Sequence, residues 1–296
     1  MRRFLAIVRA TAMEVLSEPL ALLVTMSSMA LAALTPALHY HQFGDPSRMA
    51  RDAGLSALLV GGLSYAVFCT VRTFRREVES GTMQMALAHS VSRRMFFFAK
   101  LCGSYAAYLV FAATLASVSL TVVNGAEIGG ELVRNGAEIR PIWGVSFALA
   151  VSAAVVPPVL AAVLNRFAGF RFTLTANVLM AALSVAGVAY RFDARLAARF
   201  LPVAAMLLLP AAVFAAASAA FAARWRANAA LSASGLLFAA ALPLMGNYCL
   251  PDVLYKGGSL PPWHFALALV ATAPLVAGFA AMGAQTLERR DVEGGL

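Results

Sequence analysis

The stretch "VRTFRREVESGTMQMALAHSVSRRMFFFAK", residues 71–100, connects two long apolar runs of a 296-residue chain. It carries eight charged side chains, which are Arg72, Arg75, Arg76, Glu77, Glu79, Arg93, Arg94 and Lys100. A charged side chain at the centre of a bilayer costs roughly 2.5–3.5 kcal/mol, so burying all of them would cost on the order of 20 kcal/mol. We therefore expect this connection to lie in water or at a membrane surface, between two helices that lie in lipid.

The composition of the whole chain agrees with lipid as its main solvent. Apolar residues make up 61% of the chain and charged residues only 12%, whereas a soluble domain is near half apolar and a quarter charged. A spanning helix needs about 20 mostly apolar residues. Uncharged runs that reach or approach this length are residues 20–38, 53–71, 101–123, 143–164, 173–190, 202–222, 231–249 and 264–283. We predict an all-α, polytopic transmembrane helix bundle of about eight spans, with residues 1–296 as a single transmembrane domain.

The distribution of basic residues predicts the orientation. With a cytoplasmic N-terminus and eight crossings, 15 Lys and Arg lie inside and 8 lie outside, as the positive-inside rule expects. If the shortest run, 173–190, instead enters the membrane and returns to the same side, the two totals do not change. Six spans plus a re-entrant hairpin therefore stays open as the alternative to eight spans.

The first 18 residues do not have the pattern of a signal peptide, because Glu14, Glu18 and Pro19 interrupt the apolar core that such a peptide needs. Phe4, Val8, Val15 and Leu16 can share one face of a helix, with Arg2 and Arg9 on another. We interpret residues 1–18 as an amphipathic helix on the inner membrane surface. A simple basic leader before the first span is the alternative.

The connection itself, residues 72–100, has an internal order. Gly81 interrupts a stretch that tolerates helix, and Thr82 can cap a short helix after it. Met83 and Leu87 then contribute to an apolar patch at helical spacing. Ser92 can cap a second helix that continues into the next span.

The start of that second helix is basic and aromatic. Arg93 and Arg94 are expected in the headgroup region, with Phe96–Phe98 at the acyl boundary. Lys100 is expected to extend its ammonium group back to the interface. The result is a short surface helix joined rigidly to a membrane helix, which is a geometry that transmits force from a cytoplasmic partner.

The order of residues in this connection resembles that of the membrane subunits of type-2 class ABC transporters. Such subunits commonly carry, after their second span, a pattern close to E-x-G-T-x-x-x-L-L-x-x-P-V-S-R followed by a lysine. The matching positions here are Glu79, Gly81, Thr82, Leu87, Val91, Ser92, Arg93 and Lys100. The usual proline is missing, since the chain reads "AHSVSR" at this point. The resemblance covers roughly the first 125 residues, including "SEPLAL" before the first span.

The resemblance implies a permease that is coupled to a separate ATPase, in an exporter of the bacterial inner membrane. The short helix would be the coupling helix, and the residues implied in ATPase coupling are Glu79, Gly81, Thr82, Met83, Leu87, Ser92 and Arg93. No G-x-x-x-x-G-K-[ST] phosphate loop occurs in the chain. ATP and Mg are therefore expected on the partner ATPase, which would be present in two copies with a homodimer of this chain. Without an ATPase partner, the same residues would form a basic loop on the inner side.

Other patterns in the chain carry weaker hypotheses. His39, His41 and His264 are favoured as ordinary interfacial histidines over a metal site, and the 3 cysteines lack metal or disulfide spacing. The outer loop 124–142 is a solvated loop or a docking site for an extracytoplasmic partner. Arg191, Arg195 and Arg199 lie on one helical stripe that suits lipid headgroups.

No catalytic motif is visible, so we expect a transport subunit rather than an enzyme, with no metal of its own. The net charge of +9 reflects basic loops between apolar runs, and we expect membrane lipid rather than nucleic acid as a partner. One alternative function is an ATPase-coupled mechanical transmitter that acts on an extracytoplasmic partner. A structural or enzymatic membrane protein without an ATPase is the third. The substrate and its binding residues are not identified by any pattern.

Overall fold

The computed structural model describes residues 1–34, 46–79, 92–134, 140–190, 192–246 and 261–289, and these residues form helices and no strand. The helices are α1 (Arg2–Leu16), α2 (Pro19–Leu34), α3 (Pro46–Glu79), α5 (Arg93–Arg134), α6 (Arg140–Ala168), α7 (Phe172–Tyr190), α8 (Ala194–Met206), α9 (Leu208–Arg224), α10 (Ala227–Gly246) and α12 (Pro262–Arg289). The predicted all-α class is thereby confirmed for the described part of the chain.

Several of these helices are long and apolar enough to cross a membrane. Within the described ranges, 6 helical segments meet that test, and α1 with α2 would make a seventh if this bent pair counts as one span. The pair is bent by 63°. In α10 the apolar stretch among described residues, Ala227–Ala241, is shorter than a span. The described part of the chain therefore has six to seven apolar segments of spanning length, as expected of a multi-pass membrane protein.

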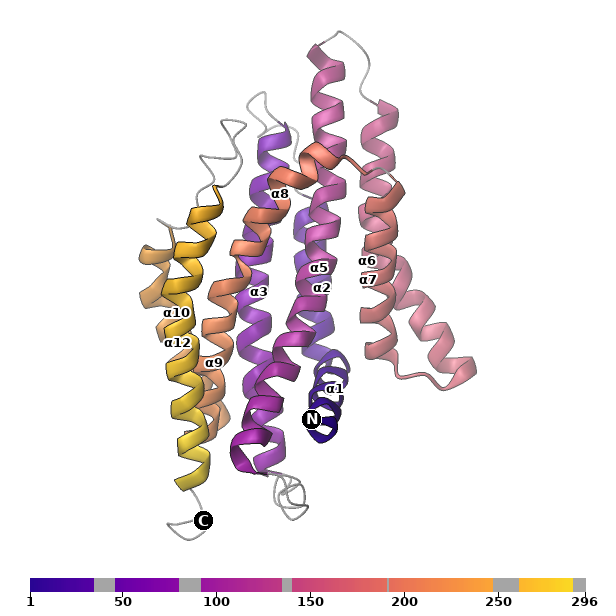
Figure 1. Ribbon diagram of the computed structural model, residues 1–296. Helices are drawn as coiled ribbons and strands as arrows, with labels where there is room; N and C mark the ends of the chain where they lie inside the picture. Colours follow the sequence, from indigo (N-terminus) through magenta and orange to yellow (C-terminus); the bar gives the residue numbers. More distant parts are fainter. Residues whose placement is uncertain (35–45, 80–91, 135–139, 191, 247–260, 290–296) are drawn as a thin grey trace.

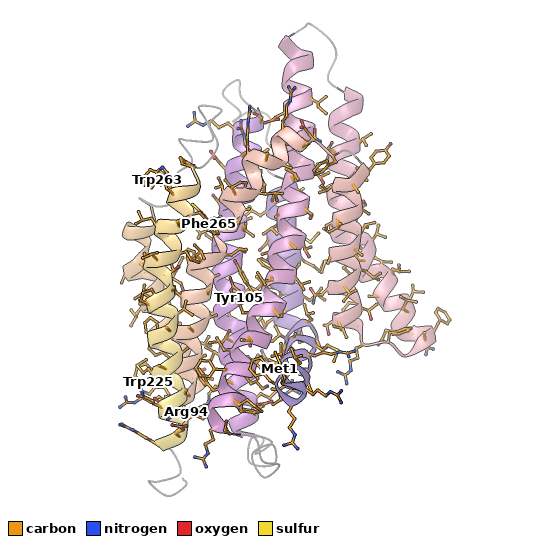
Figure 2. The ribbon with its side chains drawn as sticks, in the orientation of Figure 1. Met1, Arg94, Tyr105, Trp225, Trp263 and Phe265 are labelled. Atoms are coloured by element: carbon orange, nitrogen blue, oxygen red, sulfur yellow. The ribbon has the colours of Figure 1, made fainter. Side chains whose placement is uncertain are left out.

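The helices run alongside one another as a bundle, with α1 lying across one end (Figure 1). We call this the α1 end; it also carries the end of α3, the start of α5 and the end of α12 (Figure 1). Trp225 lies near the α1 end, and Trp263 lies near the opposite end (Figure 2). Tryptophans at both ends of a bundle are typical of membrane–water interfaces.

The centre of the bundle is the pairing of α3 with α5, which is the most extensive helix contact in the described structure. Tyr65 of α3 stacks on Phe111 of α5 with ring centroids 4.8 Å apart. The peripheral helices are much less buried. Only 6% of the most apolar stretch of α12 is buried inside the protein. Such outward-facing apolar surface suits contact with lipid or with a further membrane subunit.

Three sequence predictions differ from the structure in detail. The run 173–190 forms one unbroken helix, α7, and does not turn back within itself. Most of the predicted outer loop 124–142 is helical, because α5 continues to Arg134 and α6 begins at Arg140. The run 202–222 is divided at Leu207 between α8 and α9, and its Pro210 lies in the first turn of α9, where a missing N–H costs no helix hydrogen bond.

The amphipathic segment after α7 is confirmed. In α8, Leu196 and Phe200 are buried while Arg195 and Arg199 are exposed. Asp193 caps the helix, since its carboxylate accepts hydrogen bonds from the backbone N–H of Arg195 at 2.8 Å and of Leu196 at 3.3 Å. The apolar face thus packs on the bundle, and the basic face is left for solvent or headgroups.

Candidate functional site

The candidate site is the α1 end of α3 and α5, the two helices that the charged connection joins. Glu79 is the last residue of α3, and Ser92 and Arg93 lie at the start of α5. The remaining residues predicted to couple to an ATPase, which are Gly81, Thr82, Met83 and Leu87, lie outside the described residues. The structure therefore describes the two ends of the connection, and the predicted short helix between them stays a prediction.

The start of α5 has the cap that the sequence predicts. The hydroxyl of Ser92 accepts a hydrogen bond from the backbone N–H of Met95 at 3.3 Å. The carbonyl of Ser92 accepts another from Phe96 at 3.0 Å. Because a capped helix start has a defined direction, the chain enters α5 at a set angle.

The basic pair after Ser92 is held by α12 rather than left in the headgroup region alone. Arg94 makes a bidentate ion pair with Glu288, at 2.6 Å from Nε to Oε1 and 3.0 Å from Nη2 to Oε2. Arg93 donates to the backbone carbonyl of Glu288 at 3.2 Å. Arg94 projects at the α1 end of the bundle (Figure 2). These contacts connect the start of α5 to the last turn of α12, across 194 residues of sequence for the ion pair.

Lys100 lies inside the protein, contrary to the expectation that it would reach back to the interface. Only 2% of its side chain is exposed, and its Nζ lies 3.1 Å from Oε2 of Glu14 on α1. Glu77 of α3 forms a second ion pair with the same ammonium group. A buried ammonium is tolerated only when it is paired. The lysine therefore joins α1, α3 and α5 at one point.

A second ion-pair group surrounds the bend between α1 and α2. The carboxylate of Glu18, whose side chain is 8% exposed, lies 3.3 Å from Nε of Arg72 and 2.8 Å from Nη1 of Arg76. Both arginines belong to the last two turns of α3. This group secures the bend to the part of α3 that leads into the connection.

Side chains of α7 donate hydrogen bonds to backbone carbonyls at the same bend. Thr173 donates its hydroxyl to the carbonyl of Ser17 at 2.5 Å. Asn177 donates to the carbonyl of Leu16 at 2.9 Å and to that of Thr173 at 3.1 Å. The carbonyls of Leu16 and Ser17 lie at the end of α1, where a helix leaves acceptors without an internal partner. Asn177 is 4% exposed and supports this bend through its side-chain amide.

The predicted amphipathic leader, α1, packs against other helices of the protein. Thr11 and Val15 of α1 are buried, and Arg2 and Arg9 are exposed, as the predicted faces require. A β-carbon added at Gly103 of α5 would lie 2.7 Å from the backbone carbonyl of Val8 and 2.6 Å from Cβ of Thr11. Only a glycine lets the backbones of α1 and α5 approach this closely.

Together these contacts form what we call the anchor network, which consists of Glu14, Glu18, Arg72, Arg76, Glu77, Arg93, Arg94, Lys100 and Glu288. It binds both ends of the connection to α1 and α12. A displacement of the connection would therefore move four helices together and would not be absorbed by a loose joint.

Sequence reasoning missed the acidic members of this network. Glu14 and Glu18 were noted only because they interrupt a signal-peptide core. Their spacing of four residues from each other, next to a basic helix end, was the available signal. Nothing local in the sequence pairs Glu288 with Arg94.

The described residues hold no group of three or more His, Cys, Asp or Glu side chains that could bind a metal ion. His39 and His41 lie outside the described residues, and the ring of His264 stacks near Trp263 with centroids 3.6 Å apart. Cys69 and Cys102 are free thiols.

Comparisons with protein-family models, with curated proteins and with solved structures find no match to this chain.

Proposed function

We propose that this chain is the membrane-spanning permease subunit of an ATP-driven transporter of the type-2 ABC exporter class, located in a bacterial inner membrane. It would receive force from a separate ATPase through residues 79–93 of the connection. ATP and Mg would bind the ATPase, present in two copies with two copies of this chain. The residues for ATPase contact are those of the sequence motif: Glu79, Gly81, Thr82, Met83, Leu87, Ser92 and Arg93.

The observation that carries the proposal is the attachment of both ends of the connection. Lys100 is buried between carboxylates of α1 and α3, and Arg94 is paired with α12. Buried ion pairs are costly to assemble and favour one geometry when complete. A coupling element needs such an attachment, because force applied to a surface helix must reach the spans rather than bend a joint. The order of the motif residues, which resembles that of ABC permeases, is the reason for proposing an ATPase as the partner.

The proposal is tested by co-expression with a candidate ABC ATPase, first by copurification and then by ATPase stimulation. Thr82→Asp or Leu87→Asp adds charge to the predicted docking surface, and each is expected to reduce ATPase association about tenfold or more, since a buried charge in an interface costs over 1.4 kcal/mol. The matched control is Phe170→Asp, at an exposed position between α6 and α7. A stable complex that ignores the first two changes would show that this connection does not dock the ATPase.

A mechanical transmitter is the second candidate function, and the length of α5 favours it. This helix has 42 residues, or about 63 Å at 1.5 Å per residue, about twice the hydrocarbon thickness of a bilayer. With α6 it rises beyond the other helices at the end opposite α1 (Figure 1). One rigid helix would then run from the anchor network to an extracytoplasmic partner. Export by the purified permease and ATPase alone would contradict this alternative.

A further inference from the structure

A cavity of about 760 Å³ opens beside the last turns of α3, at the arginines with which the connection begins. Its polar lining comes from Glu18 at the α1–α2 bend and from Arg72, Arg75 and Arg76 of α3. Its apolar lining includes Phe68 of α3 and, across the space, residues of α10. A cavity of this size lies within the range of ligand sites in proteins.

The charge of this lining is positive. Three guanidinium groups face one carboxylate, so the net charge of the lining is about +2. Glu18 accepts from Arg72 at 3.3 Å and from Arg76 at 2.8 Å. A guanidinium has five N–H donors, and 54% of the Arg72 side chain and 65% of that of Arg76 are exposed. Each of these arginines therefore keeps donors for an anion while it holds Glu18.

A second cavity, of about 170 Å³, continues from the first along α3 and α10. Both cavities are lined by Phe68 and Leu231, so they meet at these side chains. The lining of the second cavity is mostly apolar, with Leu63, Val67 and Phe238 among its residues. A β-carbon added at Gly235, which also lines it, would meet no atom within 4 Å. The basic cavity thus borders a second, mostly apolar cavity at Phe68 and Leu231.

The two cavities together extend along α3 over a length that matches one lipid molecule. From Arg76 to Leu63 is 13 residues along α3, or about 20 Å at 1.5 Å per residue. One leaflet contributes about 15 Å of hydrocarbon, and the headgroup adds several ångströms. The basic part lies at the end of α3, where the chain leaves the apolar run, and the apolar part lies deeper along the same helix.

We propose that these cavities form a binding site for one anionic phospholipid, with its phosphate against Arg72 and Arg76 and an acyl chain between α3 and α10. Basic pockets between membrane helices bind anionic headgroups in this way. Because the second cavity is apolar, the site favours a phosphate that is attached to an acyl chain and disfavours a free phosphate ion. The site shares Glu18, Arg72 and Arg76 with the anchor network, but its test needs only this chain and lipid, so its outcome is separate from that of the ATPase coupling proposed above.

The headgroup is tested by native mass spectrometry of the full chain, purified in neutral detergent with equal amounts of phosphatidylglycerol and phosphatidylcholine. The wild-type chain is expected to retain phosphatidylglycerol preferentially. Arg72→Gln, which leaves Glu18 paired with Arg76, is expected to lower that preference about fivefold, equivalent to about 1 kcal/mol for one basic residue. Arg171→Gln, at an exposed arginine that does not line the cavity, is the matched control. Equal retention by both variants would overturn the headgroup assignment.

The acyl chain is tested by filling the second cavity. Gly235→Phe is expected to reduce phosphatidylglycerol retention at least threefold, while Gly278→Phe is expected to leave it unchanged. Both glycines have no atom within 4 Å of an added β-carbon, so the first atom of each new side chain has room, and equal melting temperatures of the two variants check that the fold is kept. Addition of excess inorganic phosphate distinguishes the two sources of the anion. If phosphate displaces the lipid completely and Gly235→Phe has no effect, the site binds a free anion and the lipid proposal is wrong.

Discussion

The ammonium group of Lys100 on α5 lies 3.1 Å from the carboxylate of Glu14 on α1, and only 2% of the lysine side chain is exposed. The lysine stands seven residues into α5, between Phe97 and Tyr108, which are both buried. An ion pair in such surroundings gains little net stability over apolar residues of the same volume. Its consequence is geometric: α1 docks on α5 where Glu14 reaches Lys100, and Glu77 of α3 is the second carboxylate on the same ammonium group.

Removal of this lysine should destabilise the chain. Lys100→Met leaves Glu14 and Glu77 facing each other without a cation, and the expected loss is about 3 kcal/mol, at the lower end of the range for broken buried pairs since both carboxylates keep some exposure. Thermal unfolding in detergent measures it. Glu14→Gln should cost less, because Lys100 keeps Glu77. In a double-mutant cycle of Lys100→Met with Glu14→Gln, additive effects would show that the two side chains do not interact.

A methyl group added at Gly103 should prevent the close approach of α1 to α5. Gly103→Ala places a β-carbon 2.7 Å from the carbonyl of Val8, which is backbone and cannot rotate away. The expected cost is about 1–3 kcal/mol, as for overpacking elsewhere. Gly278→Ala is the control, with open space around the added atom, and should be neutral or stabilising by up to about 1 kcal/mol. Limited proteolysis within residues 1–18 reports the release of α1. If Gly103→Ala protects α1 as well as the wild-type chain does, α1 does not dock as described.

Exchanging the two charges of the ion pair between Arg94 on α5 and Glu288 on α12 should restore its contribution to coupling. Arg94→Glu places two carboxylates together at a site where the guanidinium now makes a bidentate contact with Glu288. Under the proposed function, stimulation of the partner ATPase should fall. The double variant Arg94→Glu with Glu288→Arg should restore most of it, and the effect should weaken at high salt because the pair is solvent-exposed. A double variant no better than the single one would show that the pair does not contribute to coupling.

The support that α7 gives to the α1–α2 bend should be visible in stability. Asn177→Ala removes the donor to the Leu16 carbonyl, and an acceptor left without a partner in the protein interior costs about 1–3 kcal/mol. Ser184→Ala is a matched control on the same helix, since its hydroxyl bonds only within its own helix, to the carbonyl of Met180 at 2.7 Å. Melting temperatures of the two variants give the comparison. Equal melting temperatures would mean that water or another group replaces Asn177 at the bend.

Features that depend on a single segment were predictable. The all-α class and most of the apolar runs follow from hydrophobicity over about 20 residues. The amphipathic faces of α1 and α8 follow from the helical repeat, and the cap at Ser92 follows from its short polar side chain before a helix. Each of these depends on residues within a few turns of each other, so no knowledge of the partner helices is needed.

Features that depend on how segments meet were not predictable. Arg93, Arg94 and Lys100 lie within eight residues of each other and share one expectation, that their charges remain at the interface. The structure separates them, since Arg94 is exposed and paired with α12 while Lys100 is buried and paired with α1 and α3. The same holds for Asn177, whose partner Leu16 is 161 residues away.

The sequence alone determined that this protein forms apolar helices, because a helix satisfies every backbone group within a single uncharged run of about 20 residues in lipid. The position of the charged connection outside those runs was determined in the same way, by the cost of burying its charges. Tertiary structure alone decided which charges of that connection would be withdrawn into the protein. A buried charge is admissible only where opposite charges from other helices converge on it, and that convergence is a property of packing, which the order of residues along one helix does not contain.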